Sequence, residues 1–510
     1  MKPISAQPDE RDRQKDKSMN ASAQAGLQQD AILSPYDGSI VGHMPISGEA
    51  DIEAAVVTAQ KGFDIMRRLP RFVRADILDR TANLIEKRSE EFARLIASEA
   101  GKPLYDARGE ISRSLLNLRG ASREARAFGG QEVPLDIDSA VFEYQTANAD
   151  GTALDMNDAD LETLGSLGRR VGIARRFPIG PVLAITPFNF PLNLVLHKLA
   201  PAFAVGNSVI LKPAPQTPLT SRLLAEVMYE AGLPEEALTV VHCDVPLAEK
   251  LVRDDRIAMV TFTGSVPIGW HIKSLSGKKK VSLELGGNGA VVVSDDADIA
   301  FAAARCVRGG VVYGGQYCIG VQRIFVHEKV YDAFEKELVS RVEACKVGNP
   351  MEEGVDVGPV IDERSALRIE SWINEAVAGG ARILTGGTRN GAVVAPTVLT
   401  DTMPDMKVEA DEIFGPVITL TKVISADEGV RRAADSRFGL QGGYFTNDMK
   451  AAFRALEDWD VGALMINDVP IYRIDTMPFG GWKDSGLGRE GTRYAMDSMT
   501  DIKLLVINYG

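Results

Sequence analysis

Apolar residues recur three or four positions apart in two stretches between Asp51 and Ala100, IEAAVVTAQKGFDIMRRL and RADILDRTANLIEKRSEEFARLIASEA. This spacing is typical of amphipathic helices, and a third helix is predicted from Leu104 to Ala127. Residues 1–30 are polar and lack any such period, which predicts a disordered N-terminal tail. The acidic, polar stretch from Ala140 to Arg176 predicts an exposed excursion of low order.

A regular alternation of short apolar runs and helical segments follows this stretch. The runs are rich in β-branched residues and read VLAIT (182–186), SVILK (208–212), LTVVH (238–242) and AMVTF (258–262). Continuously apolar strands separated by helices predict a parallel sheet that is covered on both faces. This layout is typical of nucleotide-binding domains.

A second alternation begins at ELGGNGAVVVS and predicts another α/β domain. Its helices are expected near residues 298–309 and 331–345, and its strands in ARILTGG, PTVLTD and PVITLTKV. The sequence closes with LLVIN, which predicts a strand that pairs outside its own domain.

Length and charge narrow the class of protein. A chain of 510 residues is too long for one hydrophobic core, so two or more domains are expected. The formal net charge of -13 argues against a nucleic-acid or anionic-membrane partner, because either would need a clustered basic face. The most apolar segment, residues 180–206, is interrupted by Asn, His and Lys and is no membrane span. A small molecule remains as the expected partner.

The four cysteines do not form a metal-binding pattern. Cys243, Cys306, Cys318 and Cys345 contain no C-x-x-C pair and no spacing that joins them to the five histidines, so no metal site is predicted. The cytosol is the simplest compartment, because a lone thiol stays reduced there. Cys318 follows two glycines, where the backbone can turn and leave a thiol accessible; the alternative is a buried core thiol.

Unusual residues follow three of the predicted parallel strands. They are Thr186-Pro187-Phe188-Asn189, Lys212-Pro213 and Thr263-Gly264-Ser265. Ligands of open parallel sheets bind beyond these carboxyl ends. Ser265 precedes a predicted helix with Pro267 in its first turn, which suits a phosphate group; a plain helix N-cap is the alternative. No G-x-G-x-x-G follows any of these strands.

Seven motifs in a fixed order give the chain a resemblance to a known family. They are TPFNFP (186–191), LKP (211–213), FTGS (262–265), LELGG (283–287), GQYC (315–318), EIFGP (412–416) and PFGGWKDSGLGREG (478–491). The sequence resembles the aldehyde dehydrogenase superfamily over nearly its whole ordered length, and Cys318 follows Glu284 by the 34 positions that are typical of that family. It is most similar to the branch of non-phosphorylating glyceraldehyde-3-phosphate, lactaldehyde and phosphonoacetaldehyde dehydrogenases.

The resemblance implies roles for five residues in catalysis. Cys318 would be the nucleophile that forms a thiohemiacetal and then a thioester, with the Asn189 amide and the Cys318 backbone N–H stabilising the oxyanion. Glu284 would be the general base, with a pKa raised by its apolar surroundings; the alternative is an ion pair with a lysine of KKK (278–280). Lys198 and Glu490 resemble residues of a proton path, or are ordinary helix and loop charges.

The resemblance also implies NADP or NAD as the cofactor. Lys212 would bind the adenosine ribose, Ser265 the pyrophosphate, and Glu412 the nicotinamide ribose, with Phe414 beside it. The complete set of expected cofactor positions is Thr186, Pro187, Phe188, Lys212, Gly264, Ser265, Gly286, Glu412 and Phe414. Many members that use NAD have a glutamate where this chain has Pro215, which predicts that NADP is accepted.

The substrate is predicted to be a small aldehyde with a hydroxyl or anionic group. By motif position, Arg119 and Arg473 match two of the three arginines that surround the anion in the branch, and Tyr317 replaces the third. The alternative is that Arg119 lies on an exposed helix face and that Arg473 pairs with Asp475.

The resemblance implies an α/β fold with a Rossmann-type cofactor domain, an α/β catalytic domain and a small oligomerisation element of β-strands. The cofactor domain is assigned to 31–137 and 174–284, the catalytic domain to 285–489, and the oligomerisation element to 138–173 and 490–510. A homodimer or homotetramer is expected. Other functions left open are transfer of the thioester to coenzyme A, a cofactor-binding but inactive structural homologue, and a thioester hydrolase without cofactor.

Overall fold

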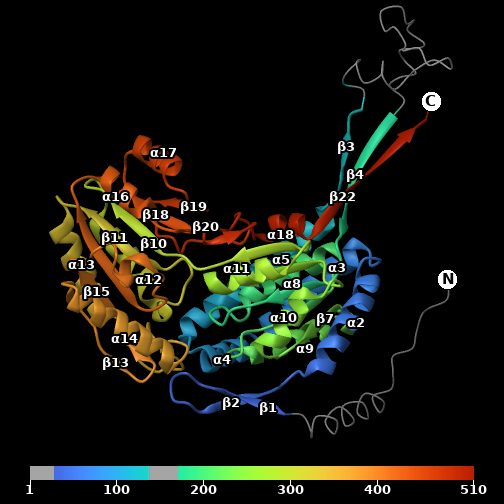
Figure 1. The fold of residues 1–510 in the computed structure, drawn as a ribbon, viewed down its shortest axis with the longest axis horizontal. Helices are drawn as coiled ribbons and strands as arrows, with labels where there is room; N and C mark the ends of the chain where they lie inside the picture. The colour runs from blue at the N-terminus through green and yellow to red at the C-terminus, as the bar shows by residue number, and fades with distance from the viewer. Residues whose placement is uncertain (1–27, 136, 138–169, 510) are drawn as a thin grey trace, which may run out of the picture.

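The computed structural model describes residues 28–135, 137 and 170–509. Two α/β bodies lie side by side, and a narrow arm of long strands projects from one of them (Figure 1). The predicted N-terminal tail up to residue 27 and the acidic excursion from 138 to 169 lie outside the described residues. Within the described part of the chain, no helix combines the length and apolarity that a bilayer span requires.

The first body contains a six-stranded sheet in the order β21-β9-β8-β5-β6-β7. Its strands are parallel except β21, which runs antiparallel to β9 and places Gly486 opposite Glu284. The strands span Val182–Ile185 (β5), Val209–Lys212 (β6), Leu238–Val240 (β7), Met259–Thr263 (β8), Lys280–Glu284 (β9) and Gly486–Leu487 (β21). The predicted runs at 182–186, 208–212, 238–242 and 258–262 are therefore strands β5 to β8.

Helices cover both faces of this sheet because successive strand residues point to opposite sides. Val182 and Ala184 of β5 join the core formed with α3, α4, α5, α8 and α9, whereas Leu183 and Ile185 join the core formed with α2, α10 and α11. The helices span Glu49–Met66 (α2), Arg71–Lys87 (α3), Ser89–Ala100 (α4), Leu104–Ala127 (α5), Asn193–Val205 (α8), Pro218–Glu230 (α9), Val245–Arg253 (α10) and Val266–Leu275 (α11).

The second body contains a seven-stranded sheet in the order β12-β15-β16-β11-β10-β18-β19, parallel except for β12. Its strands span Gly289–Val293 (β10), Val321–His327 (β11), Arg382–Thr385 (β12), Thr397–Thr400 (β15), Val417–Val423 (β16), Gln441–Phe445 (β18) and Ala463–Ile466 (β19). Its helices are Ile299–Gly310 (α12), Tyr331–Glu343 (α13), Glu363–Ala378 (α14), Ala426–Ala434 (α16) and Met449–Asp458 (α17). Only residues 285–288 separate β9 from β10, so the two sheets meet directly after Glu284.

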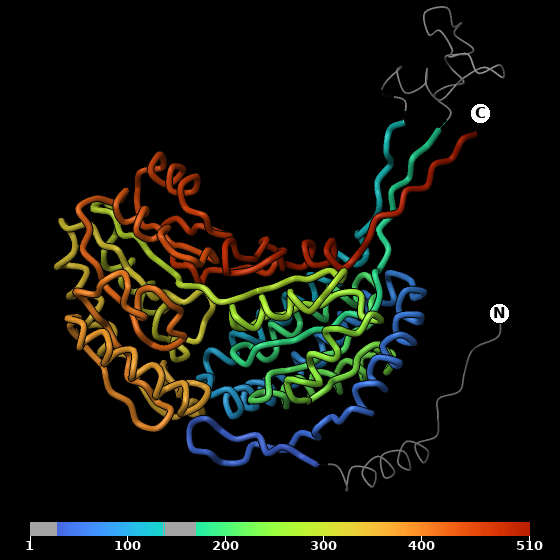
Figure 2. Tube along the Cα trace, viewed as in Figure 1, coloured from blue at the N-terminus to red at the C-terminus, as the bar shows by residue number. Residues whose placement is uncertain are grey.

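The arm is a three-stranded antiparallel sheet in the order β22-β4-β3 (Figure 2). The strands span Gln131–Val133 (β3), Arg170–Pro178 (β4) and Thr500–Asn508 (β22), and helix α18 (Thr492–Ser498) leads into the last of them. The predicted low-order excursion is therefore wrong for residues 170–176, which belong to β4. That strand also crosses the predicted boundary between the cofactor domain and the oligomerisation element.

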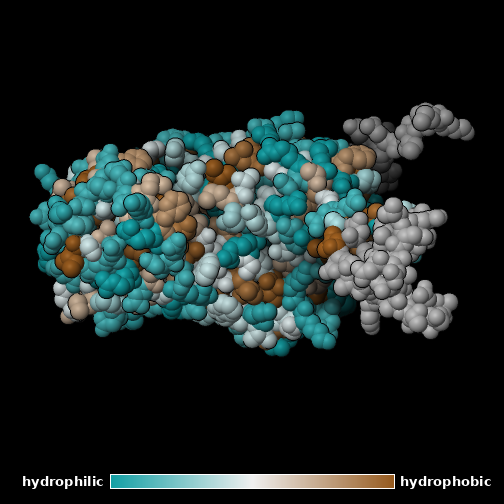
Figure 3. Space-filling view, turned by 90° about the horizontal axis from the view of Figure 1, so that it is seen from above, coloured by the Kyte–Doolittle hydropathy of each residue, from teal (hydrophilic) through white to brown (hydrophobic). Residues whose placement is uncertain are grey.

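Several short elements complete the described chain. They are β1 (Gln29–Leu33), β2 (Ile40–Pro45), β13 (Arg389–Asn390), β14 (Val393–Val394), β17 (Phe438–Gly439), β20 (Trp482–Lys483), α15 (Lys407–Ala410) and the 3₁₀ turns η2 (Glu235–Ala237) and η3 (Val312–Gly315). On the face drawn in Figure 3, hydrophobic residues form small patches that hydrophilic residues separate. The predicted α/β fold class is confirmed by this architecture.

Candidate active site

The loop before Cys318 has an uncommon backbone conformation. Tyr313, Gly314 and Gly315 follow one another in the left-handed region, with φ values of 53°, 59° and 67°. Such a run turns the chain sharply, and a tyrosine with positive φ persists only where its surroundings hold it. A Cβ at Gly287 would lie 2.4 Å from the Cys318 carbonyl oxygen, so glycine there lets the β9–β10 link approach this loop.

The Cys318 thiol is partly exposed and is neutral in the absence of ligands. It packs against a small apolar cluster of Ile319, Leu440 and Phe479. Burial and the nearby carboxylate of Glu412 raise the pKa of Cys318 to about 12. Because the thiolate is the nucleophilic form, this cysteine needs a neighbouring cation or base to react.

Asn189 is held against the loop that carries Cys318. Its amide nitrogen donates to the carbonyl oxygen of Gln316 at 2.9 Å, and its own oxygen is buried without a partner in the described chain. The Gln316 side chain in turn accepts from the backbone N–H of Ile361 at 2.8 Å. A second amide proton of Asn189 and the backbone N–H of Cys318 are therefore suited to an oxyanion on the carbon bound to sulfur.

Glu284 ends β9 as a buried carboxyl group, 2% exposed, and neither of its oxygens has a hydrogen-bond partner among the described residues. Burial and the nearby Glu490 raise its pKa well above the ordinary value. Glu284 does not form the alternative ion pair with a lysine of residues 278–280. Lys280 pairs with Asp501 at 2.6 Å instead. A buried carboxyl group without a partner is suited to take a proton from water.

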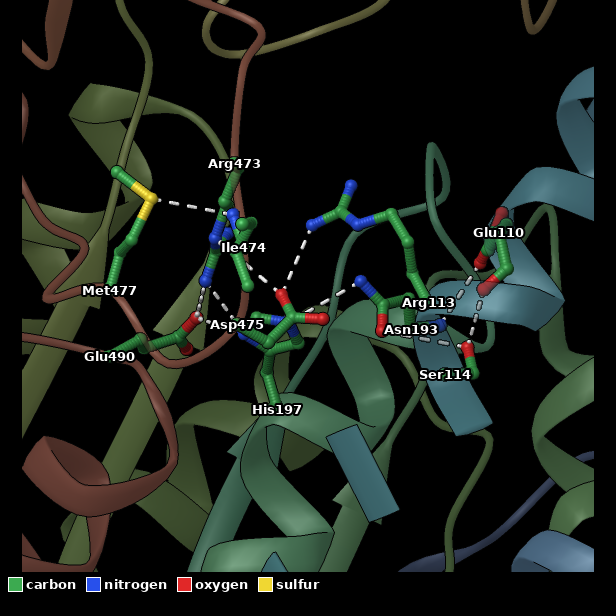
Figure 4. A network of polar contacts seen from close by, with 10 residues as sticks. All are labelled: Glu110, Arg113, Ser114, Asn193, His197, Arg473, Ile474, Asp475, Met477 and Glu490. Atoms are coloured by element: carbon green, nitrogen blue, oxygen red, sulfur yellow. Dashed lines mark hydrogen bonds and ion pairs between the residues drawn. The ribbon is translucent and has the colours of Figure 1, made fainter. Parts of the chain in front are cut away.

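Figure 4 shows a buried charge network around Arg473, Asp475 and Glu490. Glu490 is the charged group with the largest effect on the pKa of Glu284. Glu490 accepts from Lys198 Nζ at 2.8 Å, and His197 Nε2 lies 2.9 Å from Asp475. The network comprises Arg113, His197, Lys198, Arg473, Asp475 and Glu490. The structure therefore brings the two predicted proton-path residues, Lys198 and Glu490, into direct contact.

The carboxyl ends of the six-stranded sheet fit a dinucleotide. The hydroxyl groups of Thr186 and Thr263 are buried without partners in the described chain, at the ends of the neighbouring strands β5 and β8. Ser265 begins the ten-residue helix α11 without a side-chain cap, which leaves the N–H groups of the first turn for a phosphate. Lys212 ends β6 and is mostly buried, and burial lowers its pKa.

The predicted ribose and nicotinamide contacts gather between the two sheets. Glu412 accepts from the Gly287 N–H at 3.0 Å, and a Cβ at Gly286 would lie 2.2 Å from the Glu412 carboxylate, so only glycine admits it there. The rings of Phe188 and Phe414 meet edge to face at 5.8 Å. Burial raises the pKa of Glu412 to about 7. These residues fit a nicotinamide riboside, for which a carboxylate and two aromatic rings are suitable partners.

The structure corrects the position of one predicted substrate residue. Arg119 lies on the solvent side of α5, where it pairs with Glu86 at 2.7 Å. Arg113, six residues earlier on α5, faces the site instead: it donates to Asp475 at 3.1 Å and lies 6.0 Å from the Phe190 ring. Six residues correspond to about 240° of helix rotation, so the two arginines point in different directions.

The other two predicted substrate residues, Tyr317 and Arg473, lie at the site in different surroundings. Tyr317 joins an aromatic group with Phe190 and Tyr313, in which ring centroids are 5.3 to 6.3 Å apart. The Arg473 side chain is 4% exposed and enclosed in the charge network.

Arg113 and His197 were missed from the sequence. A signal was present on α5, where Glu110, Ser114 and Asn117 are polar residues at the buried helical spacing that predicts a polar contact surface.

Among residues 28–135 and 170–509, no group of His, Cys, Asp or Glu side chains is arranged to hold a metal ion. A doubly covered parallel sheet with open carboxyl ends beside a cysteine, an amide and an unpaired carboxyl group defines a nucleotide-dependent oxidoreductase.

Comparison with known proteins specifies this class. Residues 22–505 match the aldehyde dehydrogenase family, and the chain belongs to it. A 3-sulfolactaldehyde dehydrogenase of Priestia megaterium is 40% identical over 478 residues, which is 94% of each chain. A lactaldehyde dehydrogenase of Methanococcus maripaludis is 34% identical over 483 residues, which is 94% of this chain and 97% of its own. The predicted enzyme class is confirmed.

Solved structures with the same fold include complexes with ligands. Aldehyde dehydrogenase 21 of Physcomitrella patens, in complex with succinate, is 38% identical with a TM-score of 0.88 over 96% of each chain. An NADP complex of glyceraldehyde-3-phosphate dehydrogenase from Methanocaldococcus jannaschii is 33% identical with a TM-score of 0.85, over 94% of this chain and 99% of its own.

Proposed function

We propose that the protein oxidises a small aldehyde with an anionic or hydroxyl substituent to the corresponding carboxylic acid, through a thioester on Cys318. The observation that carries the proposal is the position of Glu284. This buried carboxyl group has no partner in the described chain. The link between β9 and β10 that follows it lies against Cys318, since a Cβ at Gly287 would be 2.4 Å from the Cys318 carbonyl oxygen. The pair of Glu284 and Cys318 is suited to form and then hydrolyse an acyl group on sulfur.

In the first half of the reaction, the Cys318 thiol gives its proton to the Glu284 carboxylate, which releases it to solvent; the sulfur bonds to the aldehyde carbon and the carbonyl electron pair moves to oxygen. The Asn189 amide and the Cys318 backbone N–H donate to that oxyanion. A bound nicotinamide cofactor supplies the chemistry of accepting a hydride from the same carbon. Loss of the hydride restores the carbonyl group and leaves a thioester on Cys318.

In the second half, Glu284 takes a proton from a water molecule whose oxygen bonds to the thioester carbon. The carbon–sulfur bond breaks, the acid leaves, and the electron pair returns to the Cys318 sulfur. The proton on Glu284 is then released to solvent. Glu490 does not take it up: burial opposes its ionisation, yet Lys198 at 2.8 Å, His197 and Arg473 lower its pKa far below the ordinary value, so it stays ionised.

Arg113 is the substrate-binding residue that the structure favours for an anionic group. Its guanidinium lies 6.0 Å from the centroid of the Phe190 ring, its side chain is 31% exposed, and its Nε is buried without a partner in the described chain. A free donor in a partly exposed guanidinium suits a carboxylate or sulfonate. The relatives named for 3-sulfolactaldehyde and the succinate complex support a substrate of this charge.

The residues around Lys212 support use of NADP as well as NAD. The exposed Pro215 offers no carboxylate, so Lys212 meets less competition for a 2′-phosphate. Asp244 is the nearby carboxylate, and it caps α10 by accepting from the Leu247 N–H at 3.1 Å. Steady-state kinetics with both cofactors tests this, and a large preference for NAD contradicts it.

A homodimer or homotetramer is proposed from the arm. Side chains on both faces of β22 are apolar and exposed in the single chain: Ile502, Leu504, Leu505, Val506 and Ile507 are each 41% to 60% exposed. Exposed apolar strands need a partner surface in a stable protein. The cytosol is the proposed compartment, where the free Cys318 thiol stays reduced.

A panel of aldehydes tests the proposed function. Neutral, hydroxylated, carboxylated and sulfonated aldehydes are assayed with each cofactor, with and without coenzyme A. We expect acid formation with the anionic aldehydes at the highest kcat/KM, no need for coenzyme A, and complete loss in Cys318→Ser. Acid formation by Cys318→Ser, or a strict requirement for coenzyme A, contradicts the proposal.

A further inference from the structure

Arg473 is fixed in place by three kinds of contact. Its guanidinium stacks on the Phe479 ring at 3.6 Å, and its terminal nitrogen lies 2.8 Å from Nδ1 of His197. The carboxylates of Asp475 and Glu490 lie at 3.8 and 3.9 Å. With a side chain that is only 4% exposed, Arg473 is enclosed rather than offered to a substrate.

These contacts place a positive charge next to the reacting groups. Phe479, on which Arg473 stacks, belongs to the apolar cluster against which Cys318 packs. Gly480 follows directly, and a Cβ there would lie 3.0 Å from a carboxylate oxygen of Glu284. One short segment therefore joins the guanidinium to both the thiol and the carboxyl group.

His197 links Arg473 to two carboxylates. Its Nδ1 atom lies 2.8 Å from a terminal nitrogen of Arg473 and 3.3 Å from a carboxylate oxygen of Glu490. Its Nε2 atom lies 2.9 Å from Asp475, which also accepts from Arg113 at 3.1 Å. His197 thereby ties Arg473 to an anchored carboxylate.

We propose that Arg473 is a positioning residue for the chemical step, held by His197, and that its positive charge favours the ionised forms of Cys318 and Glu284 instead of binding the substrate. The balance of charges around it supports this role. Arg473 counteracts the effects of burial and Glu412 on the pKa of Cys318. It also opposes the effects of burial and Glu490 on the pKa of Glu284, together with Lys198 and Arg489.

The surroundings also explain why Arg473 does not turn outward. The groups that face it are Glu284, Glu490, Asp475, His197 and Arg113, and the first three are acidic. Moving the guanidinium to the substrate would leave buried carboxylates without their cation, which is strongly unfavourable. Arg113 is the arginine positioned for the substrate anion, and Arg473 acts on the reacting groups.

Alkylation of Cys318 by iodoacetamide, without cofactor or aldehyde, tests the charge effect alone. The rate is followed at pH 8 by the mass of the peptide that contains Cys318. We expect Arg473→Gln to react about tenfold more slowly, because one pKa unit changes the thiolate fraction tenfold. Arg473→Lys keeps the charge and should stay within about threefold of the native rate. Arg119→Gln removes an arginine outside the site and should not change it.

Steady-state kinetics distinguishes a positioning role of Arg473 from a role in binding the substrate. In Arg473→Gln, the pH at which kcat reaches half its plateau should rise by about one unit, while the ratio of KM for anionic and neutral aldehydes stays the same. Arg113→Gln should do the opposite, raising KM for anionic aldehydes without moving the pH profile. His197→Leu frees the guanidinium and should reproduce part of the Arg473→Gln effect.

The proposal is overturned if Arg473→Gln keeps the native alkylation rate, or if its only defect is a higher KM for anionic aldehydes. If Arg473→Gln does not fold, Arg473→Lys and His197→Leu carry the same comparison: a native alkylation rate in His197→Leu also overturns it. The turnover arm rests on the proposed function, whereas the alkylation arm does not. An absence of aldehyde oxidation would therefore defeat the proposed function alone.

Discussion

Two buried carboxyl groups, Glu412 and Glu284, raise the pKa of Cys318, and burial raises the pKa of each of them. Glu284 ends β9, and Glu412 lies in the loop before β16. The two groups differ in their contacts, since Glu412 accepts a backbone N–H and Glu284 accepts nothing in the described chain. The hydrogen bond from the Gly287 N–H orients the Glu412 carboxylate, which suits it for holding a ligand. Glu284 has no such bond in the described chain and is available for proton transfer.

Glu284→Gln should separate the two halves of the reaction. Without a base, the thioester on Cys318 should form but hydrolyse about 10² to 10⁴ times more slowly, so reduced cofactor appears as a burst of one equivalent per site. In the native enzyme kcat should rise with pH, because the raised pKa of Glu284 means that the base is protonated in acid. Rapid-mixing kinetics measures both effects. A linear time course without a burst, at native rate, contradicts the assignment.

Glu412 should give the cofactor KM a pH dependence. Ribose hydroxyl groups donate to the ionised carboxylate, so the KM for the cofactor should fall as the pH rises through about 7, the pKa that burial gives this group. Glu412→Gln should raise that KM and remove the dependence. Initial rates between pH 6 and 8.5 at saturating aldehyde provide the measurement. An equal pH dependence in the variant shows that another group is responsible.

At the scale of elements, the buried ion pair between Lys102 and Glu110 connects helix α5 to the start of helix α8. Lys102, in the turn between α4 and α5, is completely buried and donates to Glu110. The same carboxylate accepts from the backbone N–H groups of Leu192 and Asn193 at the start of α8. Lys102 also lies 3.7 Å from the Phe190 ring centroid and 4.4 Å from that of Tyr313. It thereby joins the segments that bear Asn189 and Cys318.

Lys102→Met should destabilise the protein by about 3–5 kcal/mol, because it leaves the buried Glu110 without its cation. Thermal or denaturant unfolding measures the loss. The double variant Lys102→Met/Glu110→Gln should lose less, since the uncompensated charge is gone while the amide oxygen still accepts from α8. A single variant as stable as the native protein would show that Glu110 has another partner.

Helices and strands were predicted best where the pattern that marks them lies within the element itself. Strands β5 to β8 were predicted because each is a continuous apolar run that is buried on both faces. β4 was missed because it carries three basic residues and acquires its strand character from pairing with β22, which is distant in the chain. β21 has only two residues and gives no periodic signal, yet it lies directly against Glu284.

The residues of the site were also predicted only in part. The family resemblance implied one site for Cys318, Glu284 and Asn189, and the structure brings their segments together. Arg119 was named by motif position, which does not show which face of α5 is buried, and Arg113 was not considered. The contact between His197 and Arg473 joins α8 to a loop 276 positions later, and no local pattern encodes such a pairing.

At the scale of the whole molecule, the arm is the surface from which assembly of subunits is proposed. β22 exposes apolar side chains on both of its faces from Ile502 to Ile507. Leu504→Glu and Leu505→Glu place a charge on opposite faces of the strand, and we expect each to shift the protein toward smaller species. Light scattering after size exclusion gives the mass.

The matched control for this prediction is Leu367→Glu, which charges an exposed leucine on α14 and should leave the mass unchanged. An unchanged mass in both β22 variants would contradict assembly through the arm.

The order in which the ribosome releases these segments has a consequence for biogenesis. β4 emerges early, whereas its partner β22 appears only after the complete seven-stranded sheet has been synthesised, and β21 must likewise arrive late to close the edge at Glu284. Until then β4 keeps an open edge, so a nascent or truncated polypeptide has neither a finished arm nor a finished catalytic pocket. The arm and the sheet edge beside Glu284 are thereby both completed only after the second sheet has been synthesised.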